Sequence, residues 1–354
     1  MAIDWTAPMT RRARYFEMNP ATWRDVAELD GVESCSTLWD LTLPTLGSAS
    51  FKLPPVRRET WIRVYVHAEQ DGETADVAAG AWLVPPSDSD WAGARLTATA
   101  DGYTPLKELD DDGPSYGWTV DSGEDALAAA AAICAAHCRA PVVPPAAEAA
   151  LEEPYSAGDG MSWLGYVRAL LDKVGWEVMV DGMGRILFEP VRDAAALSPV
   201  MWLEVSEDSI MYPDLHDADG LRDVPNVVRV VYSEASRCLV GEAVDDDPLS
   251  PSSTVSRGRR VLHREDSPAL PDNPTQGDVD DLAARILAEK GAAQHTVTVR
   301  HGFHPDARIG RGVGIDVQPA DVMARAKVIS QQIDMTPAMA VTAQLSYSRN
   351  MRRA

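Results

Sequence analysis

The stretch that decides the fold of this chain is SWLGYVRALLDKVGWEVMVDGMGRILFEP, residues 162–190. Apolar side chains recur in its first half with the spacing of one helical stripe, at Leu164, Val167, Leu170, Leu171 and Val174. Gly175 follows as the residue that ends the helix. Trp176–Val180 and Arg185–Pro190 then flank the turn Asp181-Gly182-Met183-Gly184. We therefore predict a helix over Ser162–Val174 that leads directly into a β-hairpin.

The chain before this unit predicts short strands separated by tight turns. Residues 61–66 alternate, with Ile62, Val64 and Val66 on one face and Trp61, Arg63 and Tyr65 on the other. Residues 38–43 and 48–53 alternate in the same way. Asp-Gly pairs, which suit the positive φ angles of tight turns, begin at Asp30, Asp71, Asp101 and Asp112. Strands at this spacing predict a small sandwich or barrel over residues 15–109.

Two further helices are predicted, and strands make up most of the remainder. Glu124–Cys138 is rich in alanine, carries acids in its first turn and ends before Pro141. Asp278–Lys290 is amphipathic and is followed by a glycine. The polar, proline-containing residues 245–273 predict a long loop in part. Further strand-type segments lie at 202–205, 226–232, 296–300, 313–317, 326–335 and 340–347.

The composition argues against several classes of protein. The 354 residues hold 32 Lys and Arg against 54 Asp and Glu, a formal net charge of −22. Nucleic acids and anionic membranes reward clustered cations and repel such a surface. The longest apolar run is far shorter than the roughly 20 residues of a membrane span, and no secretory signal pattern is expected. The chain has four cysteines, Cys35, Cys134, Cys138 and Cys238, which are too scattered for a disulfide framework. We therefore expect folding in a reducing cytoplasm.

Two groups of side chains are candidate metal ligands: the cysteines on the predicted alanine-rich helix and the carboxylates of two acidic runs. Cys134 and Cys138 share a helix face next to His137, but a structural zinc needs four ligands. Cysteine on an alanine-rich helix usually fills a core. The acidic runs Asp110–Asp112 and Asp245–Asp247 do not match the helix-loop-helix calcium pattern and are better read as solvated loops.

A second group lies near the C-terminal strands. His301, His304 and Asp306, with His295 nearby, could form a site of two histidines and one carboxylate, yet polar side chains gather at such strand ends for solvation alone. The run Gly310–Gly314 is read as a turn, because a strand and not a helix follows it. The chain has no Gly-x-Ser-x-Gly elbow, phosphate-binding loop or His-Glu-x-x-His motif. We predict no catalytic, cofactor-binding or metal-binding residue, and hence no enzyme.

The order of the elements is the most specific feature of the chain. Before the 162–190 unit lie ATW (21–23), TLGSASF (45–51) and IRVY (62–65); after it lie PNVVRVVY (225–232), PLSPSS (248–253), the helix pattern LAxxIL (282–287) and a turn plus strand (309–317). This succession resembles the baseplate hub, or tail-hub, family of tailed bacteriophages, which includes the late-control-D proteins and the N-terminal parts of tail-associated lysins. The resemblance covers most of the chain. It is most specific at residues 162–190 and at the Asn226 strand with its downstream Ser-Pro segment.

The resemblance implies an α+β, β-rich fold. Two β-barrel or sandwich domains similar to tail-tube subunits would carry smaller α/β domains inserted between and within them. The first tube-like domain would cover residues 1–118, and an α/β insert of helices plus hairpin would cover 119–200. The second tube-like domain would be split into 201–240 and 305–354, around a loop-and-helix insert at 241–304.

The resemblance also implies a function and a set of partners. The chain would be a structural hub that forms a trimeric, pseudo-sixfold ring, joins the tail tube to the tip and lines the DNA-ejection channel. Its partners would be the tail tube or distal tail ring above, tip, spike or fibre proteins below, and the tape-measure protein. DNA would pass without specific binding, and no membrane anchor is expected. The location would be the virion, after synthesis in the host cytoplasm.

Two alternatives to the hub remain open from the sequence. One is a receptor- or glycan-binding tail module, for which exposed aromatic platforms would be the distinguishing feature. The other is a tail-associated cell-wall hydrolase. Tail-associated lysins continue into a peptidase or lysozyme domain, whereas this sequence ends at Ala354, so cell-wall cleavage is not expected of this chain.

The charge and the tryptophans support two hypotheses. Carboxylates that face a channel would repel phosphate and let DNA pass, although net charge also serves solubility alone. Several of the ten tryptophans lie in or beside predicted strands, where they either anchor subunit interfaces or fill cores. These are Trp39, Trp61, Trp82, Trp91 and Trp118.

Overall fold

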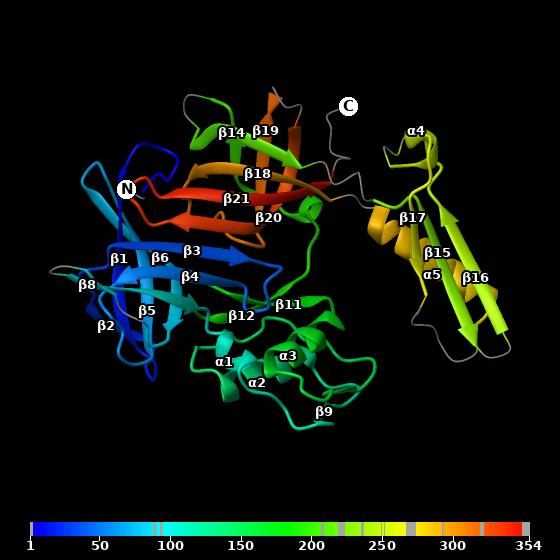
Figure 1. The fold of residues 1–354 in the computed structure, drawn as a ribbon, viewed down its shortest axis with the longest axis horizontal. Helices are drawn as coiled ribbons and strands as arrows, with labels where there is room; N and C mark the ends of the chain where they lie inside the picture. Colours follow the sequence, from blue (N-terminus) through cyan, green and yellow to red (C-terminus); the bar gives the residue numbers. More distant parts are fainter. Residues whose placement is uncertain are drawn as a thin grey trace. The chain divides into compact units, whose positions relative to one another are not determined.

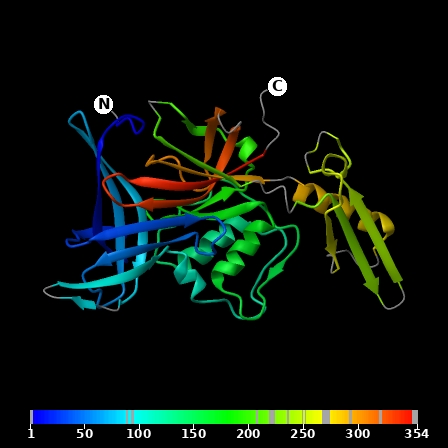
Figure 2. The ribbon, with the colours of Figure 1, turned by 45° about the horizontal axis from the view of Figure 1, so that its top comes forward.

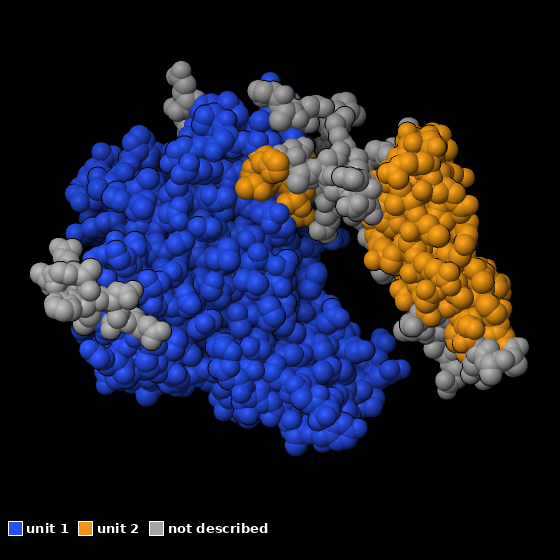
Figure 3. Space-filling view, viewed as in Figure 1, with its two compact units in different colours: residues 1–215, 299–345 blue, residues 216–298, 346–354 orange. Residues whose placement is uncertain are grey.

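The computed structural model describes residues 3–87, 90–92, 95–206, 209–218, 224–234, 237–248, 250, 252–266, 274–291, 294–318 and 322–348. The chain forms two compact units (Figure 3). The first unit is Met1–Leu215 with Val299–Leu345, and the second is His216–Thr298 with Ser346–Ala354. Each unit has its own sheet and its own buried core.

The first unit is built on one sheet of 14 strands drawn from both ends of the chain (Figure 1). Its N-terminal strands are β1 (Thr10–Asn19), β2 (Arg24–Glu28), β3 (Ser34–Asp40), β4 (Gly47–Leu53), β5 (Thr60–Gln70), β6 (Glu73–Val84), β7 (Asp90–Ala92) and β8 (Arg95–Tyr103). Its later strands are β13 (Pro199–Glu204), β14 (Met211–Ala218), β18 (Gln294–Gly302), β19 (Gly312–Val317), β20 (Val322–Asp334) and β21 (Ala340–Ser348). The main order is β14-β18-β21-β20-β3-β4-β8-β6-β5-β1-β2, with β13 joined through β19 to β20 and β7 beside β8.

Antiparallel pairing of β20 with β3 joins the two sets of strands. The partners run from Ser330 opposite Asp40 to Asp334 opposite Ser36, and Figures 1 and 2 show the orange β20 next to the blue β3. Strand β3 stops at Asp40, whereas the sequence predicted a strand that continued to residue 43. The cause is a turn in which Asp40 Oδ1 accepts the backbone N–H of Thr42 at 2.8 Å.

Helices and short hairpins follow the N-terminal strands. These elements are α1 (Lys107–Asp110), β9 (Thr119–Val120), α2 (Ala126–His137), β10 (Tyr155–Ser156), α3 (Trp163–Asp172), β11 (Trp176–Val180), β12 (Ile186–Pro190) and the 3-10 turn η1 (Ala194–Ala196). Helix α3 begins at Ser162, whose Oγ accepts the N–H of Gly165 at 3.1 Å, and is followed by Gly175 at φ +71°. Antiparallel β11 and β12 come next. The helix and hairpin predicted over residues 162–190 are confirmed, as is the predicted alanine-rich helix, which is α2.

The second unit is a three-stranded sheet, in the order β16-β15-β17, packed against one helix. Its elements are β15 (Val227–Glu234), β16 (Arg237–Val244), α4 (Thr254–Arg257), β17 (Leu262–Glu265) and α5 (Gln276–Gly291). The predicted helix at 278–290 is α5. Its core is apolar and consists of Val228, Val230, Val279, Leu282 and Ala283.

Asn226 connects the start of β15 to the Ser-Pro segment downstream. The residue is fully buried and donates from Nδ2 to the backbone oxygens of Ser252 (3.0 Å) and Arg259 (2.9 Å). Its Oδ1 accepts the backbone N–H of Val261 at 2.6 Å. All of the polar atoms of this buried amide therefore have partners, and one side chain organises the loop that the sequence predicted between residues 245 and 273. Within that range the chain also forms α4 and β17.

The sequence placed residues 201–240 in one domain, and the structure distributes them between two sheets. Strands β13 and β14 join the 14-stranded sheet, whereas β15 and β16 pair with each other and pack on α5. The physical reason is the apolar face of α5, which needs a sheet to cover it. The four-domain division as a whole stays a prediction.

The fold class expected from the sequence, α+β and rich in strands, is confirmed. Strands dominate the first unit, and the second combines a three-stranded sheet with the 16-residue helix α5. None of the helices in the described residues is long and apolar enough to cross a membrane.

Candidate interaction surfaces

A buried arginine fixes the turn of the β11–β12 hairpin against the N-terminal strands. Arg63 of β5 is 1% exposed and donates from Nη1 to Asp25 Oδ1 at 2.6 Å. Its Nη2 donates to the backbone oxygens of Trp23 (3.1 Å) and Met183 (3.2 Å). The indole of Trp23 donates to the same Met183 oxygen at 2.9 Å. One guanidinium thus connects β2, β5 and the hairpin turn.

Arg63 lies in a part of β5 that is buried on both faces. Alternation in the sequence placed Trp61, Arg63 and Tyr65 on one face and Ile62, Val64 and Val66 on the other, which predicted a strand but not its burial. In the structure Trp61 is 2% exposed and packs against Trp23 with ring centroids 4.9 Å apart. The first half of the strand is therefore buried on both faces. The cover includes the turn at Met183, which lies 120 residues further along the chain, so local periodicity carries no sign of it.

The turn approaches β6 so closely that it requires glycine. A Cβ built on Gly182 would lie 2.0 Å from the backbone oxygen of Ala78. A Cβ on Gly184, which has φ +75°, would lie 2.5 Å from the Cβ of Ala81. Both glycines are thus needed for the hairpin to reach β6, one for close approach and one also for its backbone conformation.

We expect Gly182→Ala to destabilise the first unit by about 1–3 kcal/mol, the range for forcing atoms into a packed region. The added Cβ meets backbone and not a movable side chain, so relief requires the hairpin to shift away from β6. Urea unfolding followed by tryptophan fluorescence measures the effect. Gly158→Ala is the matched control, because a Cβ there has open space and the residue has no positive φ. Equal midpoints for the two variants would contradict the close approach.

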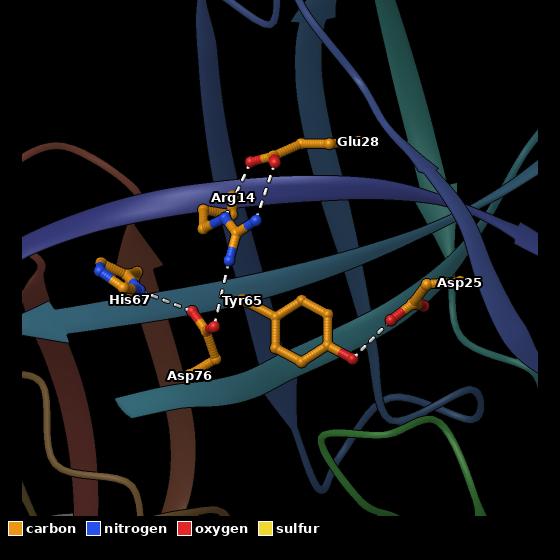
Figure 4. Close-up of polar contacts among 6 residues, drawn as sticks. All are labelled: Arg14, Asp25, Glu28, Tyr65, His67 and Asp76. Atoms are coloured by element: carbon orange, nitrogen blue, oxygen red, sulfur yellow. Dashed lines mark hydrogen bonds and ion pairs between the residues drawn. The ribbon is translucent and has the colours of Figure 1, made fainter. Parts of the chain in front are cut away.

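Paired charges cover one face of β1, β2, β5 and β6 (Figure 4). Arg14 donates to both oxygens of Glu28 at 2.8 Å and to Asp76 Oδ2 at 3.1 Å. His67 Nδ1 lies 2.8 Å from Asp76 Oδ1. The hydrogen bonds from Arg14 lower the pKa of Glu28, and the same bonds raise the pKa of Arg14. The charge of Arg14 is thus already matched by carboxylates, which does not favour phosphate binding at this residue.

The residues considered for a zinc site on α2 point into different surroundings. Cys134 is fully buried, and burial raises the pKa of its thiol to about 12. Cys138 Sγ donates to the backbone oxygen of Pro105 at 3.3 Å, and burial raises its pKa as well. His137 stacks on Trp163 with ring centroids 4.3 Å apart. Among the described residues, no group of three or more His, Cys, Asp and Glu side chains is arranged to hold a metal ion.

His301, His304 and Asp306 are neighbours in sequence, but in the described part of the chain their side chains are not arranged as a set of metal ligands. His301, at the end of β18, is 2% exposed, and its Nδ1 lies 2.7 Å from the backbone oxygen of Gly302. Burial lowers the pKa of His301 to about 4 and also lowers that of His304. The backbone N–H of Asp306 donates to His304 Nδ1 at 3.2 Å. The side chain of His295 lies outside the described residues.

A cavity of about 70 Å³ lies beside this loop, among β6, the hairpin and β20. Apolar side chains line it, together with the side chains of Asp181, Glu189, His304, Arg308 and Arg311. Burial lowers the pKa of Arg308, whose Nε donates to the backbone oxygen of Pro305 at 2.6 Å. The volume has room for a few water molecules. Nearby, Gly310 has φ +80° and lies in a turn, so the predicted turn is confirmed there, whereas Gly312 and Gly314 already belong to strand β19.

The carboxylates of the acidic runs bind neighbouring lysine and serine side chains. Lys107 Nζ donates to Asp110 Oδ2 at 3.3 Å and also pairs with Asp111. Asp245 Oδ2 accepts the hydroxyls of Ser250 (2.6 Å) and Ser252 (3.3 Å). These carboxylates stabilise turns, as the simpler reading of the sequence held.

The interface-anchor hypothesis is wrong for three of the five tryptophans. Trp39, Trp61 and Trp82 are 6%, 2% and 0% exposed, so they fill the core of their own chain. Trp118 is half-buried against Trp163 and Tyr166, with ring centroids 5.2 and 5.1 Å away. The side chain of Trp91 lies outside the described residues. The exposed strand tryptophan is Trp202 of β13, at 48%, which the sequence pattern did not single out because burial of the indole depends on its neighbours.

Comparison with solved structures identifies the class of fold. The tail protein from Neisseria meningitidis MC58 matches with a TM-score of 0.68 at 14% identity, over 95% of this chain and 96% of that one. The 43 kDa tail protein of prophage MuSo2 from Shewanella oneidensis matches at 0.67 and 10% identity, over 95% and 98%. A chain of the PdpA–VgrG complex from Francisella matches at 0.59 and 8% identity, over 98% of this chain and 59% of that one.

The chain therefore has a phage tail protein fold, and the resemblance expected from the order of its elements is confirmed at the level of the fold. Both tail proteins match over nearly their whole length. No protein-family model matches the sequence, and no curated protein matches it.

Proposed function

We propose that this protein is a structural component of a phage tail tip or baseplate, and specifically a hub that assembles as a homotrimer with pseudo-sixfold symmetry. The observation that carries the proposal is the similarity of 95% of the chain to two tail proteins, at TM-scores of 0.68 and 0.67. The hub would join the tail tube or distal tail ring to tip, spike or fibre proteins, with the tape-measure protein as a further partner. Its place is the virion.

An exposed edge strand supports assembly into a larger particle. Strand β2 pairs with β1 alone among the described strands, and its five residues are all exposed, including Val26 at 64%. An edge strand presents unpaired backbone groups that another chain can complete. The 14-stranded sheet ends at this strand on one side and at β14 on the other.

The net charge of −22 supports passage of DNA through the ring without binding. In the proposal, carboxylates outnumber cations along the channel and repel the phosphate backbone. A reconstruction of the assembled ring decides this point. A channel lined by arginine and lysine would remove the electrostatic part of the proposal.

The mass of the purified chain tests the trimer. Light scattering and mass photometry across dilution should give three times 38.3 kDa, and grids should show threefold rings. A species that remains a monomer at every concentration, with no rings on the grid, would contradict the trimeric hub.

The proposal also holds that the chain acts through its surfaces and not as an enzyme. Three of the side chains that the sequence offered as candidate metal ligands, His301, Cys138 and His137, make contacts within the fold. A zymogram on purified bacterial cell walls should therefore show no clearing. A cleared band at the position of the chain would overturn this part of the proposal and favour the hydrolase alternative.

A further inference from the structure

Trp202 lies flat on the sheet surface of the first unit and faces outward. It belongs to β13, where Met201 and Leu203 point into the core at 8% and 0% exposure, while Trp202 and Val200 are 48% and 40% exposed. Strand β13 pairs in parallel with β19, and Trp202 stands opposite Gly314. The exposed indole is therefore part of a regular strand, and its position is set by backbone pairing.

Gly314 holds the ring in this orientation. A Cβ built on Gly314 would lie 2.3, 2.4 and 2.6 Å from Cδ2, Cε3 and Cε2 of Trp202. Nearly equal distances to three consecutive ring atoms place the glycine under the face of the six-membered ring and not at its edge. The indole thus covers the glycine with one face and presents the opposite face outward. Any larger residue at position 314 would lift the ring off the sheet.

Charged side chains of both signs lie beside the ring on the same sheet face, together with the apolar Val200 and Met323. Residues paired across neighbouring strands share a face, and so do residues two apart along one strand. Pairing of β19 with β20 sets Gly314 opposite Arg325, which places Arg325 in the row of Trp202. The next row contains Glu204 and Asp316, which stand opposite each other. We name the surface formed by Trp202, Glu204, Asp316 and Arg325 the Trp202 platform.

We propose that the Trp202 platform binds a carbohydrate, with one pyranose ring stacked on the outward face of the indole. A flat aromatic face matches the C–H face of a sugar whose hydroxyls are equatorial, as in β-linked glucose and N-acetylglucosamine. The carboxylates of Glu204 and Asp316 accept hydrogen bonds from vicinal hydroxyls, and the guanidinium of Arg325 donates to hydroxyl or ring oxygens. All four side chains project from paired strands of one sheet, which keeps the site rigid.

The charge of the platform favours a neutral glycan over other occupants. Two carboxylates beside the ring disfavour the phosphates of a nucleic acid. Trp and Arg are common at protein–protein interfaces, but Glu and Asp are depleted there, and here Glu204 and Asp316 lie in the row next to the ring. A second copy of the chain is therefore a poorer match to this surface than a neutral polymer rich in hydroxyl groups.

Calorimetric titration of the full chain with chitohexaose and with cellohexaose tests the proposal. We expect saturable binding of at least one of these two β-linked oligosaccharides and none of maltohexaose, whose α-linkages bend the chain away from a flat surface. Trp202→Ala should weaken binding by about tenfold or more, as removal of a stacking aromatic does at other sites. Trp202→Phe should keep most of the affinity, and Arg325→Ala should reduce it several-fold, about three- to tenfold.

Tyr116→Ala is the matched control, because Tyr116 is an aromatic residue 81% exposed and lies outside the platform. It should bind the sugar as the wild type does. Absence of binding of both β-linked oligosaccharides by the wild type at millimolar concentration would overturn the proposal. So would unchanged binding by a folded Trp202→Ala variant, or a Trp202→Ala variant that loses self-association alone, since the platform would then be a contact between copies. The glycan site is independent of the hub: the mass of each variant tests the trimer separately.

Discussion

Replacing Arg63 by alanine should destabilise the first unit by about 3 kcal/mol or more. Removing one partner of a buried ion pair typically costs about 3–5 kcal/mol, because the other partner keeps its desolvation penalty without compensation. Here the substitution leaves Asp25 without its donor at 2.6 Å and deprives Met183 and Trp23 of a donor to their backbone oxygens. The value is set at the lower end because the side chain of Asp25 is 28% exposed, so water replaces part of the loss.

Urea unfolding monitored by tryptophan fluorescence measures this change, since Trp23 and Trp61 lie next to Arg63. Arg14→Ala is the matched control. Arg14 lies on the neighbouring strand β1 and also binds two carboxylates, but its side chain is 26% exposed and those of its partners 45% and 40%. Surface pairs of this kind contribute about 1 kcal/mol or less. If both variants lost stability equally, burial would not be the source of the effect at Arg63.

Acidification from pH 6.5 to about pH 4 should cost the first unit about 3 kcal/mol of stability through His301 alone. Burial lowers the pKa of this side chain from 6.5 to about 4 in the folded protein. Below pH 6.5 the unfolded chain binds a proton that the folded chain does not bind until about pH 4. Stability is therefore complete above pH 6.5 and decreases by about 1.4 kcal/mol for each pH unit down to pH 4.

Urea unfolding at half-unit pH steps tests the effect, with His301→Gln as the comparison. The variant has no group that titrates at this position, so its stability should decline less by about 3 kcal/mol over the same interval. Carboxylates whose pKa is lowered, such as Glu28, are common to both proteins and cancel in the difference. His304 contributes a change of the same sign in both proteins. Parallel profiles for wild type and variant would contradict a neutral, buried His301.

Arg63 and His301 also illustrate why the burial of a polar residue could not be predicted from the sequence. His301 was considered as a metal ligand because of its neighbours in sequence, whereas its environment is a buried backbone carbonyl. Alternation placed Arg63 on one face of a strand, and the local pattern gave no sign that a turn distant in sequence covers it. In both cases the sequence gives the residue type, but the burial of the side chain depends on segments far away in the chain.

The exposure of the tryptophans on strands could not be predicted from the sequence either. Trp39, Trp61, Trp82 and Trp202 all lie on strands, and a strand pattern treats them alike. Three of them are buried and one is half exposed, because Trp39, Trp61 and Trp82 point to covered faces of the sheet, whereas Trp202 points to the exposed face of β13. The flat orientation of the Trp202 ring depends in addition on Gly314, which is 112 positions away and reaches it only through parallel strand pairing.

The sequence by itself determined the elements whose stability is local. Periodic apolar residues, the Ser162 cap and Gly175 define helix α3, and a four-residue turn defines the hairpin that follows. The order of such elements was enough to indicate the phage tail protein fold. Only the tertiary structure decided that β20 joins β3 in one sheet, that Arg63 is buried beneath the hairpin turn and that Trp202 faces outward. These features rest on contacts between residues far apart in the chain, whose formation depends on the packing of the whole unit and leaves no periodic trace in either segment.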